Sequence, residues 1–290
     1  MDSRISTLLS VALNVEPFRV ETLLATPSVS LARFDHPPGA SLPCTFSAHE
    51  AAGEVRINIV ERGWFRLRYG RREWTLGTGS IFLSRPGDEY RYSHLKHLEP
   101  DTCLRVGFCT PLPNELPGLL NGLSLVLPAT NRLSLLRLQL SAIASPEIEM
   151  SLDTLACELV DAAANARNDR RHLYRPEQLK WYARKIGAAR ELMEADPTAQ
   201  HSFWHLSSHV AMSPFLFARV FRDLVGMPPH KYLVRLRLER ARHLLESGMA
   251  VTDVCYAVGF NNVSHFIRSF RRRFGVVPST LKRRRKLRIK

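Results

Sequence analysis

The spacing of hydrophobic and polar residues divides the chain into two parts. Between about residues 30 and 110, apolar and polar residues alternate, as in EVRINIVERGWFRLRYGRREWTLGTGSIFLSRPGDEY. Turn-forming residues interrupt this alternation at Gly63, Gly70, Gly77, Gly79 and the Pro86-Gly87 pair. A period of two with frequent turns predicts an antiparallel β-sandwich or β-barrel.

From about residue 131 the apolar residues recur every three or four positions, which predicts helices over 131–145 and 151–167. The proline-rich stretch TPLPNELPG is a predicted connector before them. NDRRHLYRPEQ breaks the helical pattern and is the predicted linker, and everything beyond it to about residue 285 has helical spacing. We therefore expect an α+β protein of two domains, 1–170 and 171–290.

The predicted helix over 131–145 is apolar on two sides. Leu133, Leu136, Leu140 and Ile143 form one stripe, and Leu135 and Leu138 extend the apolar surface to the opposite side. Such a helix either packs under the β-domain or contacts a second subunit, and the sequence leaves both alternatives open.

A sequence module occurs twice in the second half. FARVFRDLVGMPP at 217–229 and FIRSFRRRFGVVP at 266–278 match position by position at an offset of 49 residues. Before each stretch lies a shorter helical segment, and good capping residues mark the helix starts. Each pair of short helices with a tight turn predicts a helix-turn-helix. The predicted caps and stops are Ser202, Ser213, Pro214, Gly226, Thr252, Asn262 and Gly275.

A longer helix is predicted between the two modules, over HKYLVRLRLERARHLLES and ending before Gly248. At 1.5 Å per residue it spans about 27 Å. Successive major-groove faces on one side of B-DNA are about 34 Å apart. One chain could therefore place two recognition helices in adjacent grooves, and the slightly short spacer favours DNA bent toward the protein.

Charge is concentrated in the second half of this +14 chain. Residues 170–290 hold 25 Lys and Arg against 8 Asp and Glu, whereas the remainder has a net charge of −3. A basic domain attracts polyanions, so nucleic acid is the expected partner and an anionic membrane surface the alternative. The absence of a membrane-length apolar run and of a signal-peptide pattern predicts a cytoplasmic protein.

Five cysteines, an odd number without a C-x-x-C pair, argue against a disulfide framework or a cysteine-rich zinc site. We expect them to be small buried apolar residues.

Residues of about 180–283 resemble the DNA-binding domain of the AraC/XylS family of bacterial transcription regulators. The segments that carry the resemblance are RLRLERARHLL and VCYAVGFNNVSHFIRSFRRRFGVVPS. Ser207 and Cys255 depart from the small alanine usual there, and Pro228 is an extra proline beside Pro229. The resemblance implies promoter DNA and RNA polymerase as partners, with transcription activation as the associated role and a homodimer as the assembly.

Base-reading residues should lie on the recognition helices, off the buried face and near the helix starts. Arg219 and Arg268 are the strongest candidates because arginine pairs bidentately with guanine; the alternative is a phosphate contact or a solvated charge. Arg222, Arg271, Arg272 and Arg273 are expected to hold phosphates. The other expected base-contacting residues, which match the family positions, are Phe215, Ala218, Val263, Ser264, His265 and Ile267. For His265 the alternative is packing at the turn.

The first half resembles the cupin-like sensor domain that precedes many AraC-type domains, through HEAAGEVRINIVERG and GSIFLSRPGDEY. His49 and Glu54 supply part of the first metal motif of cupins, but Tyr90 stands where the second motif has histidine. We therefore expect no metal, no cofactor and no enzymatic activity. His49, Arg56, Trp64 and Tyr90 are the candidate lining of a ligand pocket inside a cupin-like β-barrel, the alternative being Trp64 in the core and Arg56 on the outer face.

These observations predict a sequence-specific DNA-binding transcription regulator whose first half binds a small-molecule effector and dimerises. One alternative is a regulator controlled by dimerisation or a protein partner without a small-molecule ligand. A DNA-binding protein with an enzymatic, metal-containing cupin half is a third hypothesis. The sequence leaves the effector, the operator and the sign of regulation open.

Overall fold

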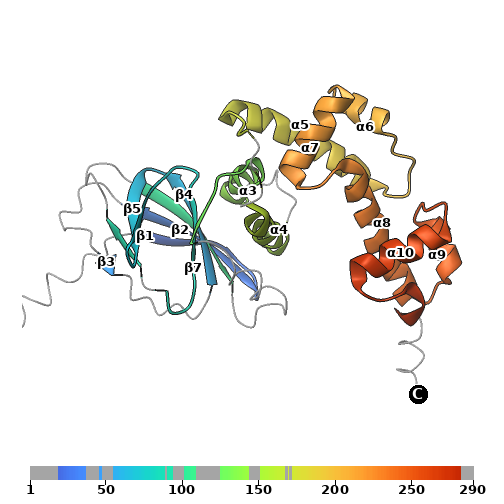
Figure 1. Cartoon of the computed structure of the whole chain (residues 1–290), viewed down its shortest axis with the longest axis horizontal. Coiled ribbons are helices and arrows are strands. Elements are labelled where there is room, and N and C mark those ends of the chain that lie inside the picture. The colour runs from blue at the N-terminus through green and yellow to red at the C-terminus, as the bar shows by residue number, and fades with distance from the viewer. Residues whose placement is uncertain are drawn as a thin grey trace, which may run out of the picture. The chain divides into compact units, whose positions relative to one another are not determined.

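A computed structural model describes residues 19–36, 46–47, 55–88, 90–93, 101–108, 125–143, 151–166, 169 and 172–281. The chain forms two units, Met1–Leu173 and Tyr174–Lys290. Strands and two helices make up the described part of the first unit, and the described part of the second is helical (Figure 1). This arrangement confirms the predicted α+β class with a β-rich first half and a helical second half.

Two antiparallel sheets form the first unit. The larger has the strand order β1-β2-β9-β4-β7-β10 and the smaller β3-β8-β5-β6. The strands are β1 Arg19–Ala25, β2 Val29–His36, β3 Phe46–Ser47, β4 Val55–Arg62, β5 Trp64–Tyr69, β6 Arg72–Gly77, β7 Ile81–Ser84, β8 Arg91–Ser93, β9 Asp101–Phe108 and β10 Val126–Leu127.

The six-stranded sheet is apolar on both faces, as strand β4 shows. Ile57 and Ile59 belong to a core shared with two helices, whereas the next residue, Val60, belongs to a core shared with the smaller sheet. Neighbouring residues of a strand point to opposite faces, so β4 contributes to both layers. Phe65 and Tyr90 pack edge-on against Phe82 between the two sheets, with ring centroids 6.0 and 6.1 Å away.

Helices α3 (Asn131–Ser141) and α4 (Leu152–Asn165) cover the other face of the larger sheet. Leu133, Leu136 and Leu140 are at most 1% exposed in that core, so the predicted intramolecular packing accounts for this stripe. Leu135 and Leu138, on the other side of α3, are half-buried. The two helices are joined by an ion pair between Arg132 Nη1 and Asp161 Oδ2 at 2.5 Å.

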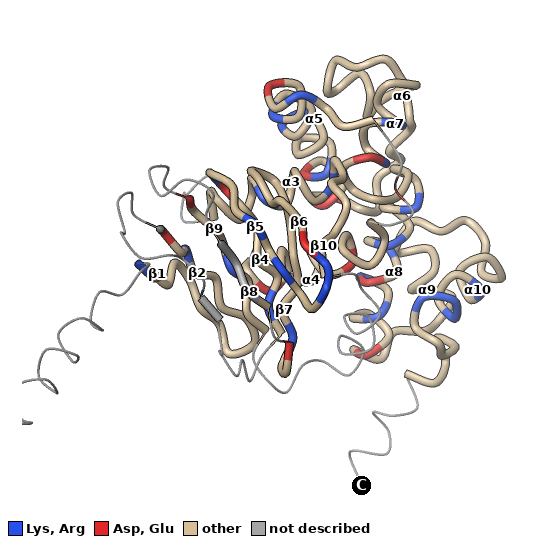
Figure 2. Tube along the Cα trace, turned by 60° about the vertical axis from the view of Figure 1, so that its left-hand side comes forward, with Lys and Arg blue, Asp and Glu red and all other residues tan. Residues whose placement is uncertain are grey.

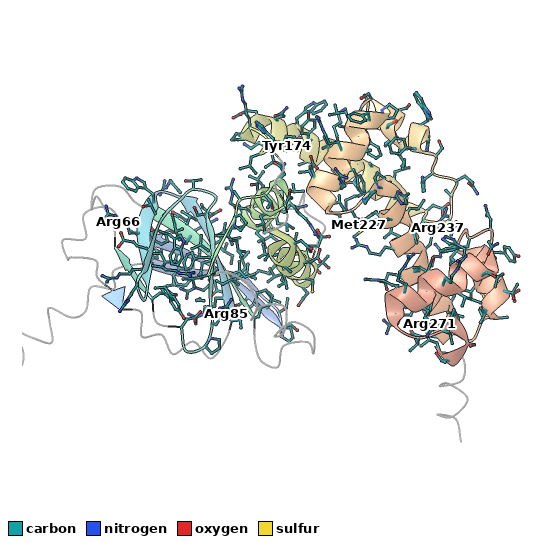
Figure 3. The ribbon with its side chains drawn as sticks, in the orientation of Figure 1. Arg66, Arg85, Tyr174, Met227, Arg237 and Arg271 are labelled. Atoms are coloured by element: carbon teal, nitrogen blue, oxygen red, sulfur yellow. The ribbon has the colours of Figure 1, made fainter. Side chains whose placement is uncertain are left out.

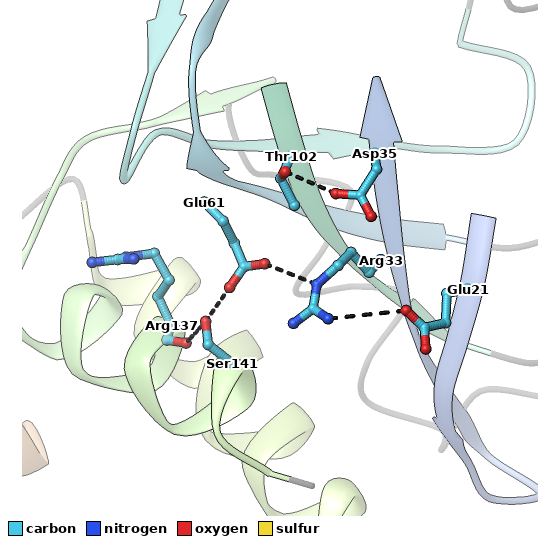
Figure 4. A network of polar contacts seen from close by, with 7 residues as sticks. All are labelled: Glu21, Arg33, Asp35, Glu61, Thr102, Arg137 and Ser141. Atoms are coloured by element: carbon cyan, nitrogen blue, oxygen red, sulfur yellow. Dashed lines mark hydrogen bonds and ion pairs between the residues drawn. The ribbon is translucent and has the colours of Figure 1, made fainter. Parts of the chain in front are cut away.

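A polar network fastens the end of α3 to the strands (Figure 4). The Ser141 hydroxyl donates to the Glu61 carboxylate, which also accepts from Arg33 Nε at 3.4 Å. Close by, Thr102 Oγ1 donates to Asp35 Oδ1 at 2.8 Å. The bonds of Glu61 thus join α3 to β4 and β2, and the Thr102–Asp35 bond joins β9 to β2.

Three of the five cysteines lie in the described part of the chain. Cys255 is buried and Cys103 half-buried, but Cys157 is exposed on α4. The expectation of buried cysteines is wrong for Cys157, because it lies on the solvent side of a helix whose inner face is filled by Leu155, Ala156 and Leu159.

The second unit contains both predicted helix-turn-helix modules. Module 1 consists of α6 and α7, and module 2 of α9 and α10. Helix α8 joins them and α5 precedes them. The bounds are α5 Pro176–Ala195, α6 Phe203–His209, α7 Pro214–Val225, α8 Pro229–Glu246, α9 Val251–Ala257 and α10 Val263–Phe274.

Most of the predicted helix ends are confirmed. Ser202, Ser213 and Asn262 each accept a hydrogen bond from the backbone N–H three residues on. Gly226 and Gly275 end the two recognition helices in the left-handed conformation that glycine adopts without strain. The predicted cap Thr252 is wrong.

Helix α9 has Ala250 as its N-cap and makes no side-chain capping bond. Val251 and Val254 pack in the core of module 2, and this packing starts the helix before the residue best suited to cap it.

The two modules differ by one residue in the turn. Two residues, Ala211 and Met212, separate the caps in module 1, whereas Gly259, Phe260 and Asn261 separate them in module 2. Each turn closes with a backbone bond to the first helix, from Met212 to Ser207 and from Phe260 to Cys255. Ser207 and Cys255 are both 0% exposed, so their small side chains fit the tight helix crossing.

Candidate nucleic-acid interface

Helix α7 separates an apolar face from an exposed one. Phe217, Val220, Phe221 and Leu224 are at most 2% exposed. Phe215 is 79% exposed, Arg219 and Arg222 are exposed, and Ala218 is half-buried. The structure therefore places the sequence-predicted residues of this helix on the face opposite the core, within its first three turns.

Helix α10 repeats the arrangement. Phe266 and Phe270 are 0% exposed, and Phe274 packs against the same core. The exposed predicted residues are Ser264, His265, Arg268, Arg271, Arg272 and Arg273. Val263 and Ile267 are partly buried against the module core, so less of their surface is available for bases.

Two of the predicted residues on α10 also have partners within the protein. Arg273 Nη2 forms an ion pair with Glu239 Oε1 of α8 at 2.9 Å. The His265 ring lies 5.5 Å from the Phe260 ring, centroid to centroid, although its side chain is exposed. His265 thus packs at the turn and still faces solvent.

The exposed faces of both recognition helices carry positive charge without acidic residues. Helix α10 has no Asp or Glu, and the single acid of α7, Asp223, is 4% exposed. Tyr174 donates a hydrogen bond to its inward-facing carboxylate. Lysine and arginine also follow α5 and α8 (Figure 2). The exposed faces of α7 and α10 attract phosphates, because they present no carboxylate of their own.

Comparison with known proteins assigns both halves. Residues 206–284 match the family model described as a helix-turn-helix domain, and residues 45–102 match the model described as an AraC-like ligand binding domain. The chain is 29% identical over 248 residues to the HTH-type transcriptional activator RhaS of Klebsiella pneumoniae (strain 342), covering 79% of this chain and 85% of that protein. The chain belongs to the AraC/XylS family.

Two further similarities cover shorter parts of this AraC/XylS-family protein. It is 43% identical over 68 residues to RhaS of Escherichia coli O1:K1 / APEC, covering 23% of this chain and 24% of that one. A crystal structure of a transcriptional regulator with an AraC-type DNA-binding domain from Chromobacterium violaceum is 31% identical, at a TM-score of 0.34, covering 35% of this chain and 92% of the other. The protein is a DNA-binding transcription regulator of the AraC type, with an AraC-like ligand-binding domain in its first half.

The predicted ligand-contacting residues of this regulator lie in different places. Arg56 is half-buried on β4 and Tyr90 is 9% exposed in the core between the sheets. Trp64 is 39% exposed, on the face of β5 opposite Phe65 and Leu67, so it does not line the inner side. Both predictions for Trp64 are therefore wrong, because it neither lines the inner side nor lies in the core. His49 and Glu54 lie outside the described residues.

A polar group on the inner face of the larger sheet was missed from the sequence. Arg105 Nε donates to Asn58 Oδ1 at 3.1 Å, Asn58 Nδ2 donates to Ser84 Oγ at 3.3 Å, and the Arg105 guanidinium lies 3.8 Å from the Phe34 ring centroid. Asn58 and Arg56 alternate with Ile57 and Ile59, so both face the smaller sheet.

The signal for this group was a polar residue between apolar neighbours within a strand, Asn58 between Ile57 and Ile59 in β4 and Arg105 between Leu104 and Val106 in β9. Within the part of the chain that the structure describes, no cluster of three or more His, Cys, Asp or Glu could hold a metal ion. Nor does any described helix have the length and apolar character needed to cross a membrane.

Proposed function

We propose that this regulator binds promoter DNA sequence-specifically, with α7 and α10 reading two successive major-groove segments on one face of the duplex. The carrying observation is that Arg219 and Arg268 occupy equivalent exposed positions of two recognition helices, on the side opposite the buried phenylalanines. Helix α8, with its 18 residues, spans about 27 Å between the modules. That length suits two modules on adjacent groove faces.

In this proposal Arg219 and Arg268 read the base sequence, and the other arginines position the protein on the DNA backbone. Arg219 and Arg268 pair with guanine, and Phe215, Ala218, Val263, Ser264 and His265 contact neighbouring base edges. Arg222, Arg271 and Arg272 lie farther along the helices and hold phosphates, which set the register without reading sequence.

Selection from random duplexes at near-physiological salt tests the specific-binding proposal. The full-length protein is expected to retain duplexes that share two short conserved blocks about one helical turn apart. Retention of all duplexes alike, with binding lost uniformly as salt rises, would mean that the basic unit binds by charge alone.

The first unit is proposed to bind a small-molecule effector between its two sheets. The match to an AraC-like ligand binding domain and the polar residues Arg56, Asn58, Ser84 and Arg105 on the inner sheet face support this. An effector shifts DNA binding if it favours one arrangement of the protein over another. A thermal-shift screen of small molecules tests it: a stabilising compound should lose its effect in Asn58→Ala.

A homodimer through α3 is proposed from the half-buried Leu135 and Leu138, which the β-unit core does not use. Sedimentation of the wild type and of the double variant Leu135→Glu/Leu138→Glu tests it. The wild type should be a dimer and the variant a monomer, and the same state for both would contradict an α3 interface. By analogy with its activator relatives, we propose that the dimer activates transcription with RNA polymerase in the cytoplasm and catalyses no reaction.

A further inference from the structure

One arginine connects the two helix-turn-helix modules. Arg237 lies part-way along α8 (Figure 3). Its Nε donates to the Pro197 carbonyl at 2.7 Å and its Nη2 to the Ala199 carbonyl at 3.0 Å, both in the loop that leads into module 1. Its Nη1 donates to the Gly259 carbonyl, in the turn of module 2, at 2.7 Å.

The chemistry of the contact requires a guanidinium. Three nitrogens of one planar group reach three carbonyls that come from two separate chain segments. A lysine ammonium also has three donors, but it is a single point and cannot spread them over such a fan. Burial of the Arg237 side chain lowers its pKa, and a neighbouring carboxylate, Asp196, opposes this shift. The arginine nonetheless stays charged, so its hydrogen bonds to the carbonyls are charge-assisted.

Gly259 shows how closely the segments approach. Its φ is +86°, and an added Cβ would lie 3.0 Å from Arg237 Cζ and 3.0 Å from the Thr198 carbonyl oxygen. The module 2 turn therefore lies directly against both the arginine and the loop before module 1. A side chain at this position would push the arginine and the loop apart.

We propose that Arg237 is a positioning residue that fixes the two modules relative to each other and thereby sets the spacing of DNA blocks that the protein accepts. The proposal rests on the proposed two-groove binding. Helix α8 alone fixes the separation of the modules along its axis, but each module could still turn about the residues that connect it to the helix. The three hydrogen bonds of Arg237 remove that freedom.

The test uses full-length protein and the two-block duplex selected by the wild type, together with duplexes that carry one base pair more or fewer between the blocks. One base pair rotates the second block by about 35° around the DNA axis. Wild type is expected to lose affinity about tenfold or more for each altered duplex. Arg237→Lys should bind the original duplex about five- to tenfold more weakly than the wild type does, and the altered duplexes within about twofold of that level. Its spacing profile, the affinity plotted against the number of base pairs between the blocks, should therefore be flat, whereas that of the wild type is steep.

Two controls separate positioning from a general loss of folding. Arg242→Lys removes another α8 arginine, one that pairs with Glu246 a turn later, and should keep the steep wild-type profile. A duplex with a single block measures each module alone, and Arg237→Lys should bind it within about twofold of the wild type. A uniform loss on single-block and two-block duplexes would mean that Arg237 only stabilises the unit, which contradicts the proposal.

Two glycine variants test the same contact if Arg237→Lys folds poorly. Gly259→Ala should flatten the spacing profile, because the added Cβ displaces Arg237. Gly248→Ala introduces a similar backbone strain, at φ +101°, but nothing lies within 4 Å of its added Cβ. Gly248→Ala should therefore leave the profile steep, and equal profiles for the two variants would overturn the role of this contact.

The outcomes also separate this inference from the proposed function. A wild type without any preference for spacing would contradict two-groove binding and the positioning role together. A steep wild-type profile that stays steep in Arg237→Lys and Gly259→Ala would leave two-groove binding intact and overturn the role of Arg237.

Discussion

The Tyr174 hydroxyl donates a hydrogen bond to the Asp223 carboxylate, with 2.5 Å between Oη and Oδ2. Tyr174 is the first residue of the helical unit, and Asp223 lies on the recognition helix of module 1. The Tyr174 ring also packs edge-on against Tyr182 of α5, 4.9 Å between centroids. The start of the helical unit is thus fastened to α7, and the acid of that helix is kept away from its exposed face.

We predict that Tyr174→Phe lowers the free energy of unfolding of the helical unit by about 1 kcal/mol, because Asp223 loses a donor in a partly buried site. Chemical denaturation followed by tryptophan fluorescence measures it. Tyr256→Phe is the control, since Tyr256 is 58% exposed on α9 and should change stability little. Equal effects of the two variants would contradict the role of the bond.

The same bond predicts a pH dependence. Burial and the hydrogen bond to Asp223 raise the pKa of Tyr174 above its ordinary value of 10.0. A raised pKa in the folded state means that the stabilisation is complete below about pH 10 and is lost as pH rises through the folded pKa. The stability difference between wild type and Tyr174→Phe should be constant from neutral pH to about pH 9 and shrink above pH 10.

The salt dependence of DNA binding tests the phosphate contacts. Arg222→Ala and Arg271→Ala should each weaken binding to all duplexes alike and reduce the slope of log affinity against log salt by about 1. Arg184→Ala, at an exposed position of α5, is the control and should keep the wild-type slope. A changed sequence preference in Arg222→Ala or Arg271→Ala would show that these residues read bases instead.

A substitution at Ala211 is expected to stabilise the protein. Its φ of 49° is a left-handed conformation that costs an alanine roughly 1–2 kcal/mol, and the corresponding residue of module 2 is Gly259. Ala211→Gly should raise the free energy of unfolding by about 0.5–1 kcal/mol, after the greater flexibility of glycine in the unfolded chain is subtracted. Ala257→Gly, inside α9, should lower it. Thermal unfolding of the two variants should therefore shift in opposite directions.

Thiol labelling tests the placement of the cysteines. Partial burial, with Asp153 and Glu158 nearby, raises the pKa of the Cys157 thiol, and burial raises the pKa of Cys255. We expect Cys157, which is exposed, to react with a thiol reagent in the native protein at a rate that increases with pH through 9. Cys157→Ser should remove one reacting thiol and Cys255→Ser none. Loss of a fast-reacting thiol in Cys255→Ser would contradict the structure of module 2.

The helix ends of the DNA-binding unit could be predicted because their signals are local. Ser213, Asn262, Gly226 and Gly275 act through bonds and dihedral angles within a few residues of themselves. The prediction of Thr252 as an N-cap was wrong because α9 starts where Val251 packs, and packing in the module core outweighs one capping bond. The exposed faces of the recognition helices followed in the same way from the spacing of their phenylalanines.

Contacts between distant segments could not be predicted. Arg105 meets Asn58 across 47 residues, and Arg237 meets the Pro197 carbonyl across 40. In β5, Trp64 shares a face with Arg66 and Arg68, whereas Phe65 and Leu67 form the apolar face, so the alternation already indicated that Trp64 points outward. The prediction for Trp64 was wrong because it followed the large apolar ring of this residue rather than the alternation of its neighbours.

Guanine N7 methylation protection on the selected duplex tests the central claim most directly, because N7 lies in the major groove where arginine reads guanine. The wild type should protect guanines in two clusters about 10 base pairs apart on one face. Arg219→Ala should lose protection in one cluster and Arg268→Ala in the other, each with about 1–3 kcal/mol less discrimination at its block. A single protected cluster, or loss of the same cluster in both variants, would contradict recognition by two helices.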